Sequence, residues 1–427
     1  MGTRAKCVIS CATIILIASV LIMGGCGYQY KCGVTFGNSS CSSSGGSGLG
    51  TTGTTSGATA FAYSVAFSGS VNGSSLTSGS SASLQSISGF SAPTVPSNDE
   101  SAEIVVVPKK FVYAVFPSSQ QLYGWSINAT NGSLSAVTGS PFAIANLGFM
   151  VANSTGVNLT SMAVNPAGTL LFFAYAGSDQ IDVYQIGSTG TLTEVPGAPF
   201  STLGTIQPWN LSFDGQGKYL YVTSGMEGLG QKVAAYSIGT SGALTAVQGS
   251  PFAFNMWQLQ GDPSGKYMIG ISGRSNALNG LPDDTSLYVF SIQQSGANAG
   301  ALTQVSGSPF STQYAPVNLA VQPVSSNGNF VYSFSLNLLE PNSIEGYQLD
   351  SSSGALTVMA NSPFSNIGTG PWGQFDQSGA YLFIFSSTST SSSLGVLNVA
   401  SGTGVLTEPL GPVTLDPSTY FAITDAP

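Results

Sequence analysis

The stretch GALTAVQGSPF, residues 242–252, occurs in nearly the same form elsewhere in this chain. GALTQVSGSPF occupies residues 300–310, and GSLSAVTGSPF occupies residues 132–142. The leucine of the motif recurs at Leu84, Leu134, Leu192, Leu244, Leu302, Leu356 and Leu406. The steps between these leucines are 50, 58, 52, 58, 54 and 50 residues. Seven copies at a nearly constant period indicate a repeat architecture.

Each repeat contains four short apolar segments separated by turn residues. One repeat reads WNLSFD (209–214), KYLYVTS (218–224), KVAAYSI (232–238) and LTAVQG (244–249). The second segment alternates large aromatic residues, which is typical of a strand that packs one face on a neighbour. The turns NPAG (165–168), DGQG (214–217) and DPSG (262–265) have the composition of type I turns. Each repeat is therefore predicted to be a four-stranded antiparallel sheet.

Seven four-stranded repeats without helical periodicity predict an all-β fold, a seven-bladed β-propeller. In the G-S-P-F run, Gly and Pro are expected to end the outermost strand, and the Phe to pack between blades. The N-terminal copy around Leu84 lacks a first strand, whereas the chain ends in STYFAITDAP (418–427), which matches one. We therefore expect the C-terminal strand to pair with the N-terminal blade and close the ring.

The N-terminus differs from the repeats. Arg4 and Lys6 precede an apolar stretch, residues 8–23, that is shorter than the ~20 residues of a membrane span. The following LIMGGC resembles a bacterial lipoprotein processing site, with Met23 where Leu is usual. We predict a signal peptide over 1–25 and a lipid on Cys26 that anchors the chain in a membrane. The alternative is an uncleaved N-terminal anchor.

Residues 26–58 are predicted to be a flexible tether before a propeller over 59–427. Between Gly37 and Ala58, 18 of 22 residues are Gly, Ser or Thr, which cannot bury enough apolar surface to fold. Both readings of the N-terminus place the propeller outside the cytoplasm, on the cell envelope or secreted. A membrane is thus the first expected partner, and a monomer is expected.

The amino-acid composition excludes several classes of partner and of catalytic site. The net charge is −9, and −9 − 2 = −11 without residues 1–25, so no basic patch favours nucleic acid. The chain has no histidine, which excludes Ser-His-Asp and Cys-His catalysis and His-ligated metal sites. No cofactor and no metal are expected. Acid–base chemistry is left to carboxylates, and Asp214, Asp262 and Asp376 share one turn position where a capping role is expected.

KYLYVTSG (218–225) together with GALTAVQGSPF resembles the Y-V-T-N-type, lactonase-like seven-bladed propellers, which include 6-phosphogluconolactonase-like proteins. The resemblance covers residues 59–427, with Ser224 where that signature has Asn. It implies either a sugar-lactone hydrolase or a binding propeller. Related enzymes use His, Arg and Glu in the central cleft, but Arg274 is the only Arg after residue 4. No catalytic residue is carried over.

Candidate ligand-binding residues cluster in segments that share one face of a propeller. Trp209, Trp257 and Trp372 occur where the chain enters an innermost strand. The longest loop, 273–285, holds Arg274, Asp283 and Asp284, and the equivalent loops of earlier repeats hold Glu227 and Asp179. Aromatic residues beside carboxylates suit a carbohydrate or protein ligand. The alternative is that the Trp side chains pack between blades and the charges are solvated.

Two functions follow from these observations. The first is an exported, lipid-anchored propeller that acts as a binding or scaffold module at the cell envelope. The second is a lactonase-like hydrolase acting on a sugar lactone. The absence of histidine favours the first, and the sequence does not identify the ligand.

Overall fold

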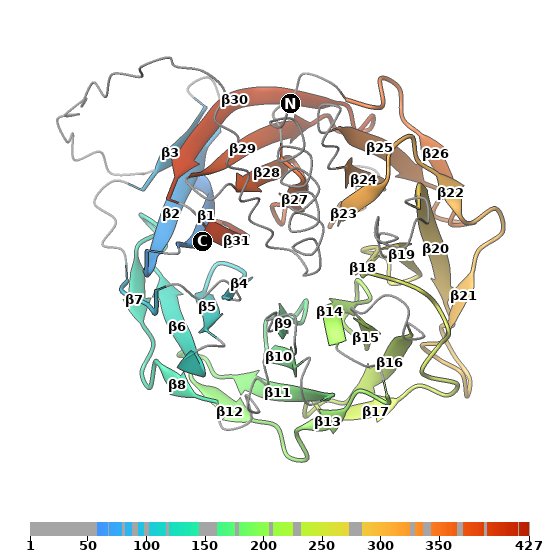
Figure 1. Cartoon of the computed structure of the whole chain (residues 1–427), viewed down its shortest axis with the longest axis horizontal. Helices are drawn as coiled ribbons and strands as arrows, with labels where there is room; N and C mark the ends of the chain where they lie inside the picture. The colour runs from blue at the N-terminus through green and yellow to red at the C-terminus, as the bar shows by residue number, and fades with distance from the viewer. Residues whose placement is uncertain are drawn as a thin grey trace, which may run out of the picture.

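The computed structural model is a ring of seven β-sheets around one axis (Figure 1). The structure describes residues 58–66, 68–78, 82–87, 93–97, 102–116, 119–144, 160–175, 179–204, 208–224, 232–272, 284–324, 329–335, 343–364, 370–387, 391–416 and 418–426. The predicted seven-bladed, all-β propeller is confirmed. The predicted signal peptide and nearly all of the predicted tether lie outside the described residues.

The blades are numbered here from the N-terminus around the ring. Blade 1 contains β1 (Ala58–Ala66), β2 (Ser70–Thr77), β3 (Ser83–Ser86) and the C-terminal β31 (Ser418–Asp425). Blade 2 contains β4 (Glu103–Val107), β5 (Phe111–Phe116), β6 (Gln121–Ile127), β7 (Leu134–Ala136) and β8 (Phe142–Ala143). Blade 3 contains β9 (Thr160–Val164), β10 (Leu170–Tyr175), β11 (Gln180–Ile186), β12 (Leu192–Glu194) and β13 (Phe200–Ser201).

The remaining blades follow the same order. Blade 4 contains β14 (Pro208–Phe213), β15 (Tyr219–Ser224), β16 (Val233–Ile238) and β17 (Leu244–Ala246). Blade 5 contains β18 (Gln258–Gly261), β19 (Tyr267–Ile271), β20 (Ser286–Ile292), β21 (Leu302–Gln304) and β22 (Phe310–Ser311). Blade 6 contains β23 (Pro316–Val321), β24 (Phe330–Ser335), β25 (Ile344–Leu349) and β26 (Leu356–Val358). Blade 7 contains β27 (Trp372–Phe375), β28 (Tyr381–Ser387), β29 (Ser392–Val399) and β30 (Leu406–Leu415).

The C-terminal strand closes the ring as predicted. β31 pairs with β1, with Ala62 opposite Ile423, and the sheet order is β3-β2-β1-β31. The C-terminus accordingly lies beside the N-terminal blade in Figure 1. This pairing gives the innermost strand of blade 1 to the C-terminus and its other three strands to the N-terminus, so β1 is not left as an open edge.

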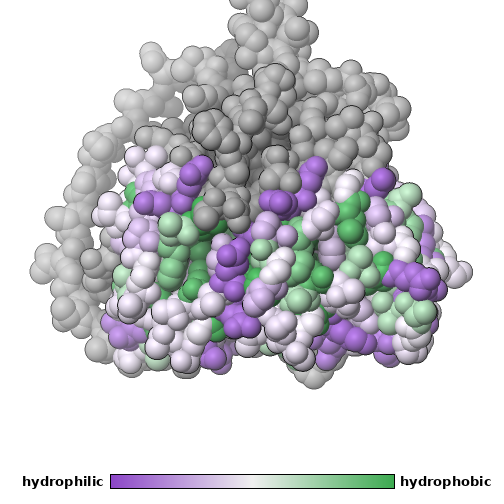
Figure 2. Space-filling model, turned by 90° about the horizontal axis from the view of Figure 1, so that it is seen from below, coloured by the Kyte–Doolittle hydropathy of each residue, from purple (hydrophilic) through white to green (hydrophobic). Residues whose placement is uncertain are grey.

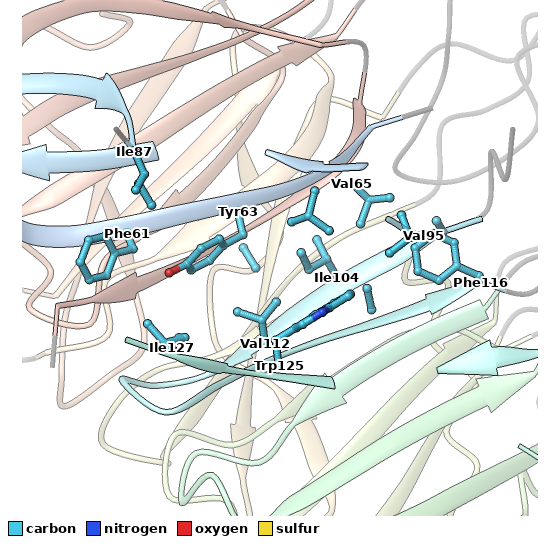
Figure 3. Close-up of a cluster of buried hydrophobic side chains, with 14 residues drawn as sticks. Phe61, Tyr63, Val65, Ile87, Val95, Ile104, Val112, Phe116, Trp125 and Ile127 are labelled. Carbon is cyan, nitrogen blue, oxygen red and sulfur yellow. The ribbon is translucent and has the colours of Figure 1, made fainter. Parts of the chain in front are cut away.

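Apolar side chains fill the space between each pair of neighbouring blades. Seven clusters of buried residues match the seven gaps in the ring. Figure 3 shows the cluster between blades 1 and 2, where Phe61 and Tyr63 of β1 face Val112 and Trp125 of blade 2. The alternating aromatics of the second strands therefore pack between blades, as the period-two pattern predicts. On the outer wall, hydrophilic and apolar residues are interspersed (Figure 2).

A tyrosine–carbonyl bond joins several blades to the next. The hydroxyl of Tyr221 donates to the carbonyl of Gly300 at 2.9 Å. Three further pairs repeat this bond: Tyr63 with Gly132, Tyr113 with Gly190, and Tyr332 with Gly404. Gly300 has φ +91, and a β-carbon there would lie 2.6 Å from the Tyr219 ring. Glycine is therefore required at this turn both by its backbone conformation and by the close approach of a neighbouring blade.

The turn aspartates cap the turns, as predicted. Asp214 accepts a hydrogen bond from the Tyr219 N–H at 2.6 Å, and Asp262 accepts one from the Tyr267 N–H at 2.7 Å. Asp376 is equally buried and accepts from the Tyr381 N–H. Burial raises the pKa of Asp214, and hydrogen bonds from turn N–H groups oppose that rise. These carboxylates hold the turns between first and second strands.

Candidate functional site

A belt of polar side chains crosses the innermost strands near their N-terminal ends. The amide oxygen of Asn210 accepts from the Leu259 N–H at 3.1 Å, and that of Gln258 from the Leu319 N–H at 3.0 Å. The belt comprises Glu103, Ser161, Asn210, Gln258 and Asn318, which occupy equivalent positions in blades 2 to 6. Innermost strands of neighbouring blades do not pair with each other, so their backbone N–H groups need side-chain acceptors. The belt supplies them.

Glu103 is the belt member whose carboxyl group has an oxygen that is not used in a hydrogen bond. The Met162 N–H donates to its carboxyl group, yet the enclosed Oε2 atom has no hydrogen-bond partner. Burial raises the pKa of Glu103 to about 8. The carboxyl group is therefore largely protonated at neutral pH, when it can donate as well as accept a hydrogen bond.

Trp209 and Trp257 meet at the same end of neighbouring innermost strands. Their ring centroids are 4.2 Å apart and the planes are tilted by 43°. Trp209 is the extra residue where the pairing of β14 with β15 shifts between Pro208 and Asn210, and such a bulge re-aims a side chain. Both indoles are half-buried, and each is followed by an amide residue of the belt. Two predicted site residues are thus brought together.

Trp372 lies elsewhere. It occupies the belt position itself in blade 7, one residue later than the paired tryptophans in theirs. Its ring centroid lies 6.4 Å from that of Phe385, and it packs on the apolar cluster between blades 7 and 1. The structure therefore does not join Trp372 to the other two.

Asp284 is described at the end of the long predicted loop. Its Oδ2 accepts from the hydroxyls of Ser272 and Tyr288, the latter at 2.8 Å. Burial, together with this hydrogen bond and the negative charge, raises the pKa of Tyr288 to about 12. Asp179, in the corresponding loop of blade 3, aligns with Thr285 and not with Asp284. It has φ +51, and its carbonyl accepts from Thr202. Glu227, Arg274, Asp283 and Cys26 lie outside the described residues.

A further described carboxylate on the second- to third-strand side, Glu345, is held by local contacts. The buried Glu345 accepts from the N–H groups of Gln313 and Tyr314 and from the Tyr347 hydroxyl at 2.7 Å. It therefore fastens the segment that connects blade 5 to blade 6. Among the described residues, no group of three or more His, Cys, Asp or Glu is placed to hold a metal ion. No helix in the described part of the chain is long and apolar enough to cross a membrane.

Sequence reasoning did not find the belt or Glu103. A sequence signal for the belt does exist: in five repeats a polar residue stands near the start of the first strand. Its meaning depends on which N–H groups are left unpaired between blades, and this is a tertiary feature. The charged residues that the sequence analysis proposed lie in loops between second and third strands, and they do not recur at equivalent positions in the repeats.

Comparisons with known proteins show the fold. No protein-family model matches the chain, and no curated protein matches it. A solved candidate 6-phosphogluconolactonase from Bacteroides fragilis is 14% identical with a TM-score of 0.58, covering 86% of this chain and 98% of that one. A periplasmic gluconolactonase from Pseudomonas aeruginosa is 13% identical with a TM-score of 0.56, covering 87% and 99%. The chain is therefore a propeller similar in fold to lactonase-like proteins.

Proposed function

We propose that the protein is a binding module of the cell envelope that holds a carbohydrate at the Trp209–Trp257 pair. The observation that carries this proposal is the contact between two half-buried indoles from neighbouring blades, 4.2 Å apart at their centroids. Indole faces suit the C–H faces of sugar rings, and the adjoining amides suit hydroxyl groups. Among the residues that the structure describes, the pair is the one place where predicted site residues from two blades are in contact.

Two observations support a location in the cell envelope: the N-terminal sequence, and the periplasmic location of a protein with a similar fold. The apolar segment 8–23 and the lipoprotein-like LIMGGC favour export and tethering. A propeller of similar fold is named as a periplasmic gluconolactonase, so this architecture is used in that compartment. Replacing Cys26 by Ser should release the protein from membranes or leave its precursor uncleaved if the lipid is attached there.

The test of the ligand site is a glycan-binding titration with Trp209→Ala and Trp257→Ala. We expect either substitution to weaken binding at least about tenfold, which corresponds to ~1.4 kcal/mol. Trp372→Ala is the matched control, because it removes the same side chain from a different wall of the ring. Thermal melting of each variant reports whether the ring is intact. Binding that is unchanged, or that falls equally in the control, would contradict the proposal, and binding of a protein but no glycan would change the ligand class.

A second candidate is the lactonase-like hydrolase, and Glu103 is the observation in its favour. A carboxyl group with a pKa of about 8 and an unpartnered oxygen can donate a proton to an oxygen leaving group. However, Asp284, a described acidic residue that the sequence predicted for the site, lies three blades away, in blade 5, and accepts hydrogen bonds from Ser272 and Tyr288. We expect no sugar-lactone hydrolysis above the uncatalysed rate. Turnover that disappears in Glu103→Gln would make the hydrolase the better reading.

A further inference from the structure

Four of the five described lysines lie on one side of the ring. Lys109, Lys110, Lys218 and Lys266, called here the lysine face, occupy the turns between first and second strands, and all four are exposed. Lys232, at the start of β16, lies on the opposite side, where second strands end and third strands begin. In a chain of net charge −9 this sorting concentrates the positive charge of the described residues on one face.

The turns between first and second strands form a continuous row across blades 2 to 5, and those of blades 2, 4 and 5 carry these lysines. A β-carbon at Gly168 would lie 3.0 Å from Val107, and one at Gly217 would lie 2.9 Å from Pro166. Gln216 donates to the Pro263 carbonyl at 2.8 Å, which links the turns of blades 4 and 5. The lysines therefore lie on one row of touching turns, in which the turn of blade 3 joins those of blades 2 and 4.

Neighbouring carboxylates only partly offset this charge. Asp214 and Asp262 share turns with Lys218 and Lys266, but both are buried and accept hydrogen bonds from turn N–H groups. The Lys218 ammonium lies 5.0 Å from the centroid of the Tyr219 ring. Two described acids on this side that are not buried lie outside blades 2 to 5: the exposed Asp350 of blade 6 and the half-buried Asp425 at the end of β31 in blade 1. Within blades 2 to 5, the described turn carboxylates on this side are therefore buried, whereas the four lysines are exposed.

The chain enters the propeller on this same face. β1 begins at Ala58, and Ala60 is paired with Asp425 at the end of β31. The preceding residue, Thr424, accepts a hydrogen bond from the Lys109 N–H at 2.8 Å. The 57 residues before Ala58, which include the apolar segment 8–23, therefore join the ring directly beside Lys109.

We propose that the lysine face docks on anionic phospholipid headgroups of the membrane to which the N-terminal segment tethers the chain. Each lysine near an anionic surface adds attraction, and a tether that starts on the same face raises the local concentration of lipid there. Docking in this way directs the opposite side of the ring, with the Trp209–Trp257 pair, away from the bilayer. The inference rests on the membrane tethering proposed above and not on the identity of the sugar.

The experiment uses the full chain reconstituted in vesicles of phosphatidylcholine alone or with roughly one third phosphatidylglycerol. A membrane-impermeant amine reagent followed by mass spectrometry measures the labelling rate of each lysine. On the anionic vesicles we expect the four lysines of the face to label at least about fivefold more slowly, and Lys232 to be unaffected. Protection should disappear in high salt, because the Debye length falls to ~3 Å at 1 M.

A variant with all four lysines changed to Gln supplies a second measurement. Amide hydrogen exchange in residues 107–111, 214–218 and 262–266 should slow on anionic vesicles for the parent and for Lys232→Gln, but not for this variant. Equal labelling on both vesicle types with the chain still bound would overturn the docking alone. Chain that leaves the vesicles altogether would overturn the tethering as well. Protection by a soluble polyanion but not by anionic vesicles would assign the face to a polymeric partner and overturn the lipid proposal.

Discussion

At the scale of the residue, the innermost strands show how a few polar atoms complete an apolar ring. Asn210, Gln258 and Asn318 each give an amide oxygen to a backbone N–H of the next blade. A carboxyl group can do the same with one oxygen but leaves the other enclosed without a donor, as at Glu103. The difference between an amide and an acid at one position is therefore expected to make stability depend on pH.

Burial raises the pKa of Glu103 from 4.5 to about 8, so the folded chain holds one more proton than the unfolded chain between these values. The stability from this group is complete below pH 4.5 and is lost as the pH rises through 8. We expect Glu103→Gln to melt at a higher temperature than the parent above about pH 8 and to show a flatter pH profile. Thermal melts across this range test it, with the exposed Glu194→Gln as control. Parallel profiles for parent and Glu103→Gln would contradict the assignment.

At the scale of the element, the G-S-P-F run does more than end a strand. In blade 5 the outermost position is shared by β21, which pairs with one half of β20, and β22, which pairs with the other half. Between them, the hydroxyl of Ser308 accepts from the Val289 N–H at 3.0 Å. The sequence prediction had Gly and Pro end the outermost strand and did not include this second segment. The pairing of β22 depends on the path of the chain past Ser308, which the sequence pattern does not show.

Blade 3 carries Ala198 where four other blades have Ser140, Ser250, Ser308 and Ser362. Each serine accepts from a backbone N–H of its third strand, but Ala198 has no hydroxyl to offer the corresponding Val183. We expect Ala198→Ser to stabilise the protein and Ser250→Ala to destabilise it, each by about 1 kcal/mol. Chemical denaturation of both variants checks the pair. Effects of the same sign would show that the serine bond is not what these positions contribute.

At the scale of the whole molecule, stability depends on joining the two ends of the chain. β31 forms the innermost strand of blade 1, and Ile423 and Ala422 contribute to the clusters on either side of it. Removing this strand would open two blade interfaces at once and leave one edge of β1 unpaired. The ring therefore has no peripheral blade that could be lost at small cost.

Deleting residues 420–427 should cost a free energy comparable with the whole ~5–15 kcal/mol margin of a folded domain. We expect the truncated protein to melt far below the parent or to fail to fold. Deleting Pro427 alone is the control, since Ala426 still donates to the Thr59 carbonyl at 2.9 Å. A truncated chain that melts with the parent would mean that β31 does not close the ring.

The sequence alone determined the repeat, the four strands of each blade and the closing strand. Such features are local or periodic: aromatic alternation in Tyr219 and Tyr221 and a turn opened by Asp214 report on neighbours along the chain. The sequence also identified Trp209 and Trp257 as a candidate site, from their shared place at the start of a first strand. These patterns recur in each repeat and do not depend on contacts between neighbouring blades.

Only the tertiary structure decided what happens between blades. That Trp209 touches Trp257 whereas Trp372 packs on Phe385 depends on a bulge and a one-residue shift, which alter a side chain's direction without altering its type. That Glu103 has an enclosed, unpartnered oxygen depends on the spacing of two innermost strands that are 50 or more residues apart in the chain. Burial and hydrogen-bond satisfaction are set by neighbours in space, and these neighbours exist only once the ring is closed.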